Sequence, residues 1–165
     1  MTTLFWIPLL PLLGIFVPLF SAKLSRTACA FLTAALPATA LLLVLLLMPQ
    51  VLEGNAIRGA IEWVPALGLE LAFRLDGLSL LFSLLILGIG LLVILYARYY
   101  LSNQDPIGKF FAYLIMFMFA MLGVVMSDNL IQLWAFWELT SISSFLLISF
   151  WGKKSEARKG ARMAL

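Results

Sequence analysis

The sequence has no histidine, one cysteine and few charged residues, which make up only 12% of its 165 positions. The lone cysteine, Cys29, excludes the disulfide framework of a small secreted domain. Water-soluble domains are about one quarter charged, so a soluble globule is excluded as well. The chain also lacks a phosphate-binding loop, a cluster of metal-ligating side chains and a nucleophile beside a base. We therefore predict neither an enzyme nor a protein with a metal or cofactor.

Apolar residues are abundant: they form 64% of the chain, and the mean hydropathy is +1.08. An intrinsically disordered chain has the opposite composition. A helix needs about 20 apolar residues to cross the hydrocarbon core of a bilayer. Stretches of about that length occur at residues 4–20, 28–48, 78–96, 110–126 and 130–151. The sequence therefore predicts an all-α membrane protein with about five transmembrane helices.

The first apolar segment contains three prolines, Pro8, Pro11 and Pro18. Membrane helices tolerate proline where neighbouring helices satisfy the backbone groups that it frees. No basic residue precedes this segment and no small-residue cleavage pattern follows it, so it does not resemble a secretory signal. We expect the segment to be retained as a membrane helix.

The basic residues are distributed unevenly between the connections. Short cytoplasmic loops of membrane proteins carry an excess of Lys and Arg. Nine of the eleven basic residues fall in connections on one side of the membrane: Lys23, Arg26, Arg98, Lys109, Lys153, Lys154, Arg158, Lys159 and Arg162. Arg58 and Arg74 fall on the other side. The pattern predicts a multi-pass protein of the cytoplasmic (inner) membrane with its N-terminus outside. It also explains the net charge of +3 without nucleic-acid binding.

The connection at residues 49–76 is predicted to be external and is too long for a tight turn. Its later part reads LGLELAFRLD, in which apolar residues recur with a period of two, as in a β-strand. Pro65 and Gly68 lie just before or at the start of this run, and Ile61 and Trp63 fit the start of an earlier strand. We predict a small external β-hairpin.

The only charged residue within the five apolar segments is Glu138. An ionised carboxylate near the bilayer centre costs about 2.5–3.5 kcal/mol on insertion scales. Glu138 lies about 12 Å along a helix from Leu130, and Trp134 and Ser141 share its helical face. Intramembrane acids mark ion paths and proton relays, so we predict that Glu138 transfers protons. The alternative is a permanently protonated side chain that hydrogen-bonds a neighbouring helix.

A proton path needs further polar groups, and the five segments contain no Lys, Arg or His. The basic partner of Glu138 must then come from a later helix or from another subunit. The chain also ends in GKKSEARKGARMAL, a basic connection that turns apolar at its last residues, like the approach to a sixth helix. Both observations predict that these residues are the N-terminal part of a longer polypeptide.

Other polar residues are candidates for supporting roles. Four hydroxyl groups could carry a water chain beside Glu138, or could permit close helix packing: those of Thr140, Ser141, Ser143 and Ser144. Asp76 and Asp128 precede predicted helices, where a carboxylate caps the first free N–H groups. The alternative for these two acids is that they line an external ion entrance.

Two stretches of the chain resemble a known family. They read MLGVVMSDNLIQLWAFWELTSISSFLLISFW (Met121–Trp151) and FRLDGLSLLFSLLILGIGLLVILYARYYL (Phe73–Leu101). Both are similar to the antiporter-like subunits shared by Mrp-type monovalent cation/proton antiporters and respiratory complex I. The SDNL and WELTS motifs are specific, and the resemblance runs from about Trp63 to the end of the chain. Within the family, the chain resembles the large A-type component of the Mrp complex.

The resemblance implies a 14-helix fold with two inverted five-helix repeats, of which this chain would hold the first five helices. It implies that Glu138 pairs with a lysine of a later helix in a proton-transfer path. It also implies a hetero-oligomer of several membrane subunits that exports cytoplasmic Na⁺ or K⁺ in exchange for H⁺. The alternatives are a proton-pumping protein like the L-type component of complex I, and a non-transporting membrane scaffold that helps a complex to assemble.

Overall fold

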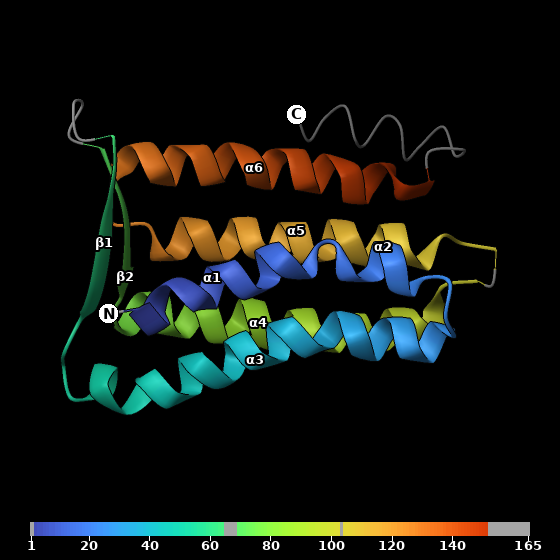
Figure 1. The fold of residues 1–165 in the computed structure, drawn as a ribbon, viewed down its shortest axis with the longest axis horizontal. Coiled ribbons are helices and arrows are strands. Elements are labelled where there is room, and N and C mark those ends of the chain that lie inside the picture. The colour runs from blue at the N-terminus through green and yellow to red at the C-terminus, as the bar shows by residue number, and fades with distance from the viewer. Residues whose placement is uncertain (1, 65–68, 103, 152–165) are drawn as a thin grey trace.

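The computed structural model describes residues 2–64, 69–102 and 104–151, which form a bundle of roughly parallel helices with a β-hairpin across one end (Figure 1). In chain order the elements are α1 (Thr2–Gly14), α2 (Val17–Ser21), α3 (Arg26–Leu52), β1 (Ile57–Val64), β2 (Leu69–Leu75), α4 (Gly77–Tyr100), α5 (Ile107–Met126), α6 (Leu130–Ile148) and the short 3₁₀ helix η2 (Ser149–Trp151). The basic run from Lys153 to Arg162 lies outside the described residues, as do Pro65 and Gly68.

Within the described residues, five helical passages are long and apolar enough to cross a membrane: Thr3–Ser21, Arg26–Leu52, Gly77–Tyr100, Ile107–Met126 and Leu130–Ile148. The predicted all-α membrane fold is therefore confirmed. The observed bounds differ from the predicted ones mainly where helices continue beyond their apolar segment. Helix α4 runs past Tyr96 to Tyr100, since tyrosine rings suit the interface between hydrocarbon and water. Helix α5 begins directly after Pro106, because a proline disfavours helical geometry in the residue before it.

The first membrane passage consists of two helices rather than the one continuous helix predicted for residues 4–20. Helix α1 ends at Gly14 and α2 begins at Val17. Pro18 accounts for the interruption, because its nitrogen has no hydrogen to donate to the carbonyl of Gly14. Pro8 and Pro11 lie within α1 and do not end it.

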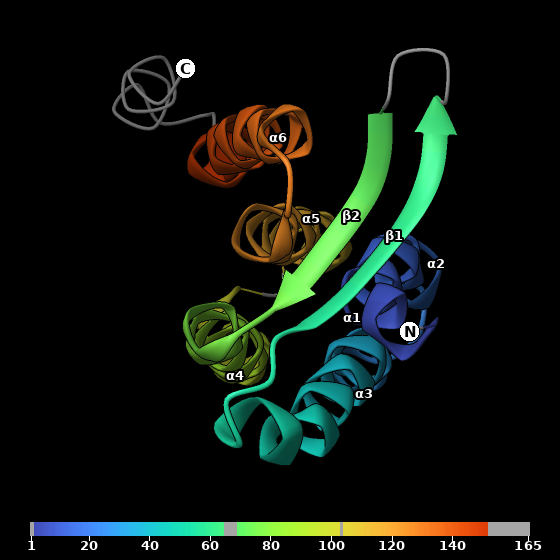
Figure 2. The ribbon, with the colours of Figure 1, turned by 90° about the vertical axis from the view of Figure 1, so that its left-hand side faces the viewer.

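The two strands pair in an antiparallel hairpin that lies across one end of the bundle (Figure 2). The register runs from the pair Ile57–Leu75 to the pair Val64–Leu69. The predicted hairpin is present, and its first strand begins earlier than Ile61, where the sequence pattern suggested a start. The IRG segment at the beginning of β1 interrupts the apolar alternation, which hides these residues from a pattern of period two.

One cross-strand pair of the hairpin places two arginines opposite each other, Arg58 and Arg74. Like charges in this position destabilise a hairpin. Opposite charges come from Glu70 of β2, which lies 4.0 Å from Arg58, and from two acids just before the neighbouring helices α4 and α6. Arg58 forms an ion pair with Asp128, and Nε of Arg74 lies 3.4 Å from Oδ2 of Asp76. The hairpin is therefore held in place by the bundle.

Helix α5 occupies the centre of the bundle. It packs against α1, α2, α4 and α6, and in the end-on view it lies between α6 on one side and α1 and α4 on the other (Figure 2). Its buried side chains recur at helical spacing and include Phe111, Ile115, Met118, Leu122 and Met126. Helix α6 packs mainly on α5 and lies at the edge of the bundle opposite α3 (Figure 1).

Helices α5 and α6 approach closely at Gly123. A Cβ atom at this position would overlap the ring of Phe136 on α6. That ring also packs edge-on against Phe119 of α5, with the ring centroids 5.4 Å apart. Because the Phe136 ring contacts both Gly123 and Phe119, it cannot move away from an added Cβ as the end of a flexible side chain could. The absence of a side chain at Gly123 therefore sets the distance between α5 and α6.

Gly123→Ala is expected to destabilise the α5–α6 contact by about 1–3 kcal/mol, the usual cost of overfilling a packed site. Gly88→Ala on α4 is the matched control, because no described atom of another helix lies within 4 Å of its added Cβ. The measurement is thermal unfolding of both variants in the same lipid or detergent. Equal midpoint temperatures for the two variants would contradict the close approach.

Candidate functional site

The two faces of α6 have different surroundings. One face packs on α5 and contains the buried side chains of Gln132 and Ser143. The opposite face contains Trp134 and Trp137, whose exposed fractions are 64% and 59%. A helix that is apolar on all sides, with one face uncovered, has a surface suited to lipid or to further protein.

Glu138 lies on the exposed face of α6. Its position is about 12 Å along the helix from Leu130, near the middle of the membrane-spanning length. Within the described residues, none of the ion pairs involves its carboxylate, and no hydrogen bond to that carboxylate is present. The described helices therefore leave the Glu138 carboxylate uncovered.

The hydroxyl groups that follow Glu138 do not form one row along the helix. Ser141 lies three positions after Glu138 and shares its face. Thr140 and Ser144 lie two and six positions after it, which places them on other faces. The helix thus brings one of the predicted supporting hydroxyls beside Glu138.

Two of these hydroxyls are bonded to the backbone of their own helix. The Thr140 hydroxyl donates to the carbonyl of Trp137 at 2.6 Å. The Ser143 hydroxyl, which is buried against α5, donates to the carbonyl of Leu139 at 2.9 Å. Ser143 therefore serves the close packing of α6 on α5.

Asp128 does not cap α6, contrary to the sequence prediction. The cap is Asn129, whose Oδ1 accepts a hydrogen bond from the backbone N–H of Gln132 at 2.7 Å. A capping residue lies directly before the first helical residue, and position 128 is one residue too early. The Asp128 carboxylate instead pairs with Arg58 of β1, and its backbone N–H donates to the carbonyl of Ala72 at 3.0 Å.

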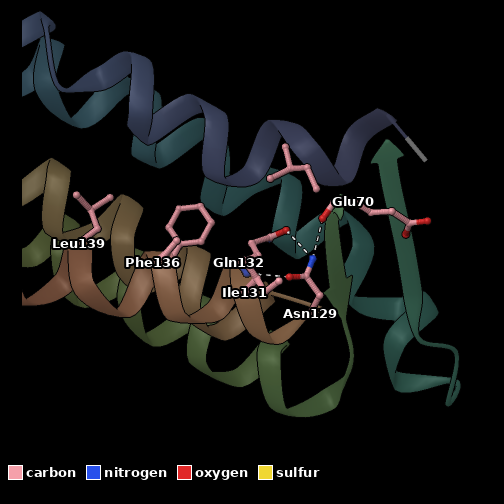
Figure 3. Close-up of a pocket in the computed structure, with 8 residues that line it drawn as sticks. Glu70, Asn129, Ile131, Gln132, Phe136 and Leu139 are labelled. Carbon is pink, nitrogen blue, oxygen red and sulfur yellow. Dashed lines mark hydrogen bonds between the residues drawn. The ribbon is translucent and has the colours of Figure 1, made fainter. Parts of the chain in front are cut away.

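Two amide side chains fasten β2 to the first turn of α6 (Figure 3). The Gln132 Oε1 accepts a hydrogen bond from the backbone N–H of Ala72 at 2.8 Å. The Asn129 Nδ2 donates to the backbone carbonyl of Glu70 at 2.7 Å. Neither residue was predicted as a site residue from the sequence. The available signal was their spacing, because an Asn followed three positions later by Gln is typical of a helix start.

A cavity of about 270 Å³ lies beside this junction (Figure 3). Its apolar wall is formed by Leu71, Ile131, Ala135, Phe136 and Leu139, and its polar end by Glu70, Asn129 and Gln132. A lining of this kind suits an apolar chain rather than an ion. Glu138 does not line the cavity, so the cavity is separate from the predicted proton-transfer residue.

Asp76 is the N-cap of α4. Its Oδ1 accepts hydrogen bonds from the backbone N–H groups of Ser79 at 3.0 Å and Leu78 at 3.1 Å. The Ser79 hydroxyl in turn accepts from the backbone N–H of Asp76 at 2.7 Å. The bond from the Ser79 N–H is the main cause that lowers the pKa of Asp76, and Arg74 adds to it. Whether Asp76 also lines an ion entrance stays a prediction.

The opposite end of the bundle carries basic side chains. Arg26, at the start of α3, donates to the carbonyls of Leu101 at 2.6 Å and Ser102 at 2.7 Å. The Arg98 guanidinium lies over the ring of Tyr99, 4.7 Å from its centroid. The bonds of Arg26 join the start of α3 to the residues that follow α4.

Two family models match the chain. The model for NADH-ubiquinone oxidoreductase (complex I), chain 5 N-terminus, matches residues 63–111. The model for the NADH:quinone oxidoreductase/Mrp antiporter transmembrane region matches residues 127–165. Together the two matches span more than half of the chain and include α4 and α6.

Curated relatives match nearly the whole chain. The A/B component of a probable K⁺/H⁺ antiporter from Rhizobium meliloti (strain 1021) is 48% identical over 157 residues, which are 95% of this chain and 16% of the relative. The A1 component of a Na⁺/H⁺ antiporter from Staphylococcus aureus is 44% identical over 158 residues, which are 95% of this chain and 20% of the relative. The chain thus spans at most about one fifth of the length of these relatives.

Solved structures match the fold. The Mrp complex from Dietzia sp. DQ12-45-1b matches with a TM-score of 0.77 and 30% identity over 90% of this chain and 16% of the other. An archaeal membrane-bound sulfane sulfur reductase shares the fold at 22% identity and a TM-score of 0.73, over 88% of this chain and 23% of the other.

The chain belongs to the family of antiporter-like membrane subunits shared by Mrp antiporters and NADH:quinone oxidoreductases. Within that family, it corresponds to the N-terminal part of the large A-type Mrp components.

The lowered pKa of Asp76 predicts a pH-dependent stability of the first turn of α4. The ionised form stabilises this turn above the unfolded-state pKa of about 4, and the contribution is lost as the pH falls through the lower folded-state pKa. Asp76→Ala is expected to cost about 1 kcal/mol at neutral pH, the usual value of a helix cap. The measurement is hydrogen exchange of the Leu78 and Ser79 amides, with Glu62→Ala in the exposed hairpin as the control. Unchanged exchange in Asp76→Ala would show that the cap contributes nothing.

Proposed function

We propose that this chain is part of a membrane subunit of a monovalent cation/proton antiporter complex, a transporter component rather than an enzyme. The observation that carries the proposal is the position of Glu138, the one acid within the apolar length of α6, on a face that the described helices leave uncovered. A carboxyl group at this depth is costly, and intramembrane acids are functional by default.

The names of the relatives support a proposal about which ions the complex transports and which kinds of protein this chain binds. The curated relatives are subunits of K⁺/H⁺ and Na⁺/H⁺ antiporters, so the proposed substrates are H⁺ and either Na⁺ or K⁺. The solved structures that match are an Mrp complex and an archaeal respiratory membrane complex. The proposed partners are accordingly other membrane subunits of a hetero-oligomeric complex and the surrounding bilayer.

In the proposed mechanism Glu138 binds and releases protons. Further protein covers the exposed face of α6 and removes the carboxyl group from lipid. A basic group within about 4–6 Å, such as the lysine that the family resemblance implies, favours the ionised form. Withdrawal of that group favours proton binding. Ser141, on the same face, is placed to hydrogen-bond the carboxyl group or a water molecule beside it.

We propose that the hairpin end of the bundle faces the outside and the opposite end faces the cytoplasm. The N-terminus lies at the hairpin end (Figure 1). Four basic residues of the described chain belong to the other end: Lys23, Arg26, Arg98 and Lys109. The excess of Lys and Arg in cytoplasmic connections sets this orientation. The complex would then export cytoplasmic cations across the inner membrane in exchange for external protons.

The second candidate is a proton-pumping subunit of a complex I-like enzyme. It is favoured by the family model that matches residues 63–111, which describes a complex I chain. Both candidates use Glu138 for proton transfer. The length of the complete reading frame separates them, since the resemblance implies a much longer C-terminal part in the large Mrp component.

Glu138→Gln tests the proton-transfer role. Glutamine keeps hydrogen-bonding capacity but cannot carry a proton, and losing a proton-transfer group typically costs about 100-fold or more in rate. Cation exchange driven by a pH gradient, measured in vesicles that contain the complete complex, is therefore expected to fall by about that factor while the subunits still assemble.

Glu62→Gln is the matched control, because it makes the same change in an exposed residue of the hairpin. It is expected to leave exchange close to the wild-type rate. Wild-type exchange by Glu138→Gln would reject the relay and leave the scaffold role, in which Glu138 stays protonated.

The proposed orientation is tested by cysteine labelling. Cys29 is buried and is replaced by Ala to give a cysteine-free background. Single cysteines are then introduced at Asn55 and Gln104, which are exposed at opposite ends of the bundle. A membrane-impermeant maleimide is expected to label position 55 from outside the cell and position 104 only from the cytoplasmic side. The reverse pattern would overturn the orientation.

A further inference from the structure

The break between α1 and α2 lies within a membrane-spanning passage. The carbonyl of Gly14 lacks its helical donor there, because Pro18 has no N–H. Gly14 and Pro18 are both buried, so this side of the break faces the interior of the bundle. A backbone carbonyl inside hydrocarbon needs a donor from a neighbouring helix, a side chain or an ordered water molecule.

Thr33 of α3 lies opposite this break. Cys29, one turn before Thr33, has its Sγ 3.9 Å from the carbonyl oxygen of Pro18. Leu36, nearly one turn after Thr33, has its Cβ 3.6 Å from the place of a Cβ on Gly14. Thr33 lies between these two contacts on the same side of α3, and it is completely buried.

The hydroxyl group of Thr33 has no hydrogen-bond partner within the described residues. A threonine hydroxyl in a helix commonly bonds to the carbonyl one turn earlier. Thr39 of the same helix does so, donating to the carbonyl of Ala35 at 2.9 Å. Pro37 also removes the helical donor for the carbonyl of Thr33 itself. An orphan hydroxyl and two carbonyls without helical donors therefore belong to the same buried region.

We infer that Thr33 and the carbonyl of Gly14 bind an internal water molecule that bridges α3 to the break between α1 and α2. Water donates two hydrogen bonds and accepts others, so it can satisfy a hydroxyl and carbonyl groups together. A buried water molecule typically makes about three hydrogen bonds. The hydroxyl of Thr33, its own carbonyl and the carbonyl of Gly14 provide that number. Ordered water is also a usual means of satisfying backbone groups freed by proline in membrane helices.

The ligand is water rather than a cation because the neighbours of Thr33 at the break are uncharged. Gly14, Pro18, Cys29 and Leu36 offer no carboxylate, and a buried cation without one is strongly disfavoured. The site is also remote from Glu138, since α3 and α6 lie on opposite sides of α5 (Figure 2). The inference therefore stands independently of the proposed function.

Whether loss of the Thr33 hydroxyl raises or lowers the unfolding midpoint of the complete antiporter complex tests the inference. An unsatisfied buried hydroxyl is a cost, so its replacement by the isosteric valine would raise the unfolding midpoint if no water were bound. With a bridging water, Thr33→Val instead shifts the midpoint to lower temperature. Thr33→Ser retains the hydroxyl and is expected to stay close to wild type. Thr39→Val is the matched control, because it removes from the same helix a hydroxyl bonded to its own backbone.

Radiolytic hydroxyl-radical labelling provides a second measurement, because radicals formed from a bound water react with buried side chains beside it. Cys29, one turn from Thr33 and completely buried, is the reporter. Its oxidation is expected to fall several-fold in Thr33→Val and to remain unchanged in Thr39→Val. A midpoint raised by Thr33→Val, or Cys29 oxidation that does not respond to it, would overturn the inference.

Discussion

Inside hydrocarbon no solvent is available to hydrogen-bond the backbone or to surround a charge, and most of this structure follows from that constraint. Polar side chains cluster at helix ends, where Ser25, Asp76 and Asn129 accept bonds from free N–H groups. Ser143, within a membrane passage, bonds to its own helix. The groups that the described bundle leaves unsatisfied, above all the carboxylate of Glu138, are therefore the places where a ligand or further protein is required.

The junction between the hairpin and α6 links the hairpin end of the bundle to the helix that carries Glu138. Backbone and side-chain bonds from residues 128–132 reach the hairpin, and Phe73 of β2 packs against Phe136 one turn further along α6. The tilt of α6 is thus set at its first two turns by the hairpin and at Gly123 by α5. Because α6 has few other neighbours among the described elements, these contacts determine which face of α6 is turned outward, and Glu138 lies on that face.

Much of the fold could be predicted from the sequence because its strongest signals are local. Apolar length predicts a membrane helix, and a period of two predicts β2. The cost of a carboxylate in hydrocarbon singled out Glu138 without any knowledge of its neighbours. The hairpin was predicted as well, although the polar start of β1 concealed its full extent.

The features that could not be predicted depend on contacts between distant residues. Helix α6 is apolar on nearly all sides, so its periodicity does not indicate which face packs on α5 and which carries Glu138 outward. The ion pair of Asp128 depends on Arg58, which lies 70 positions earlier in the chain. Gln132 bonds to Ala72 across a similar separation. The break after Gly14 followed from Pro18, whereas Pro8 and Pro11 are accommodated within α1, and local sequence does not distinguish these cases.

The pairing of like charges in the hairpin has a consequence for the order in which the chain assembles. Arg58 faces Arg74 and Glu62 faces Glu70 across the two strands. Within the described hairpin, Arg58 also lies 4.0 Å from the carboxylate of Glu70, a long contact between largely exposed side chains that contributes little. Among the described residues, the carboxylates outside the strands that pair with its arginines are those of Asp76 and Asp128, and Asp128 is synthesised after α5. The ion pair between Arg58 and Asp128 can therefore form only once the turn between α5 and α6 has reached the same side of the bilayer, so this contact to the hairpin is made late in biogenesis.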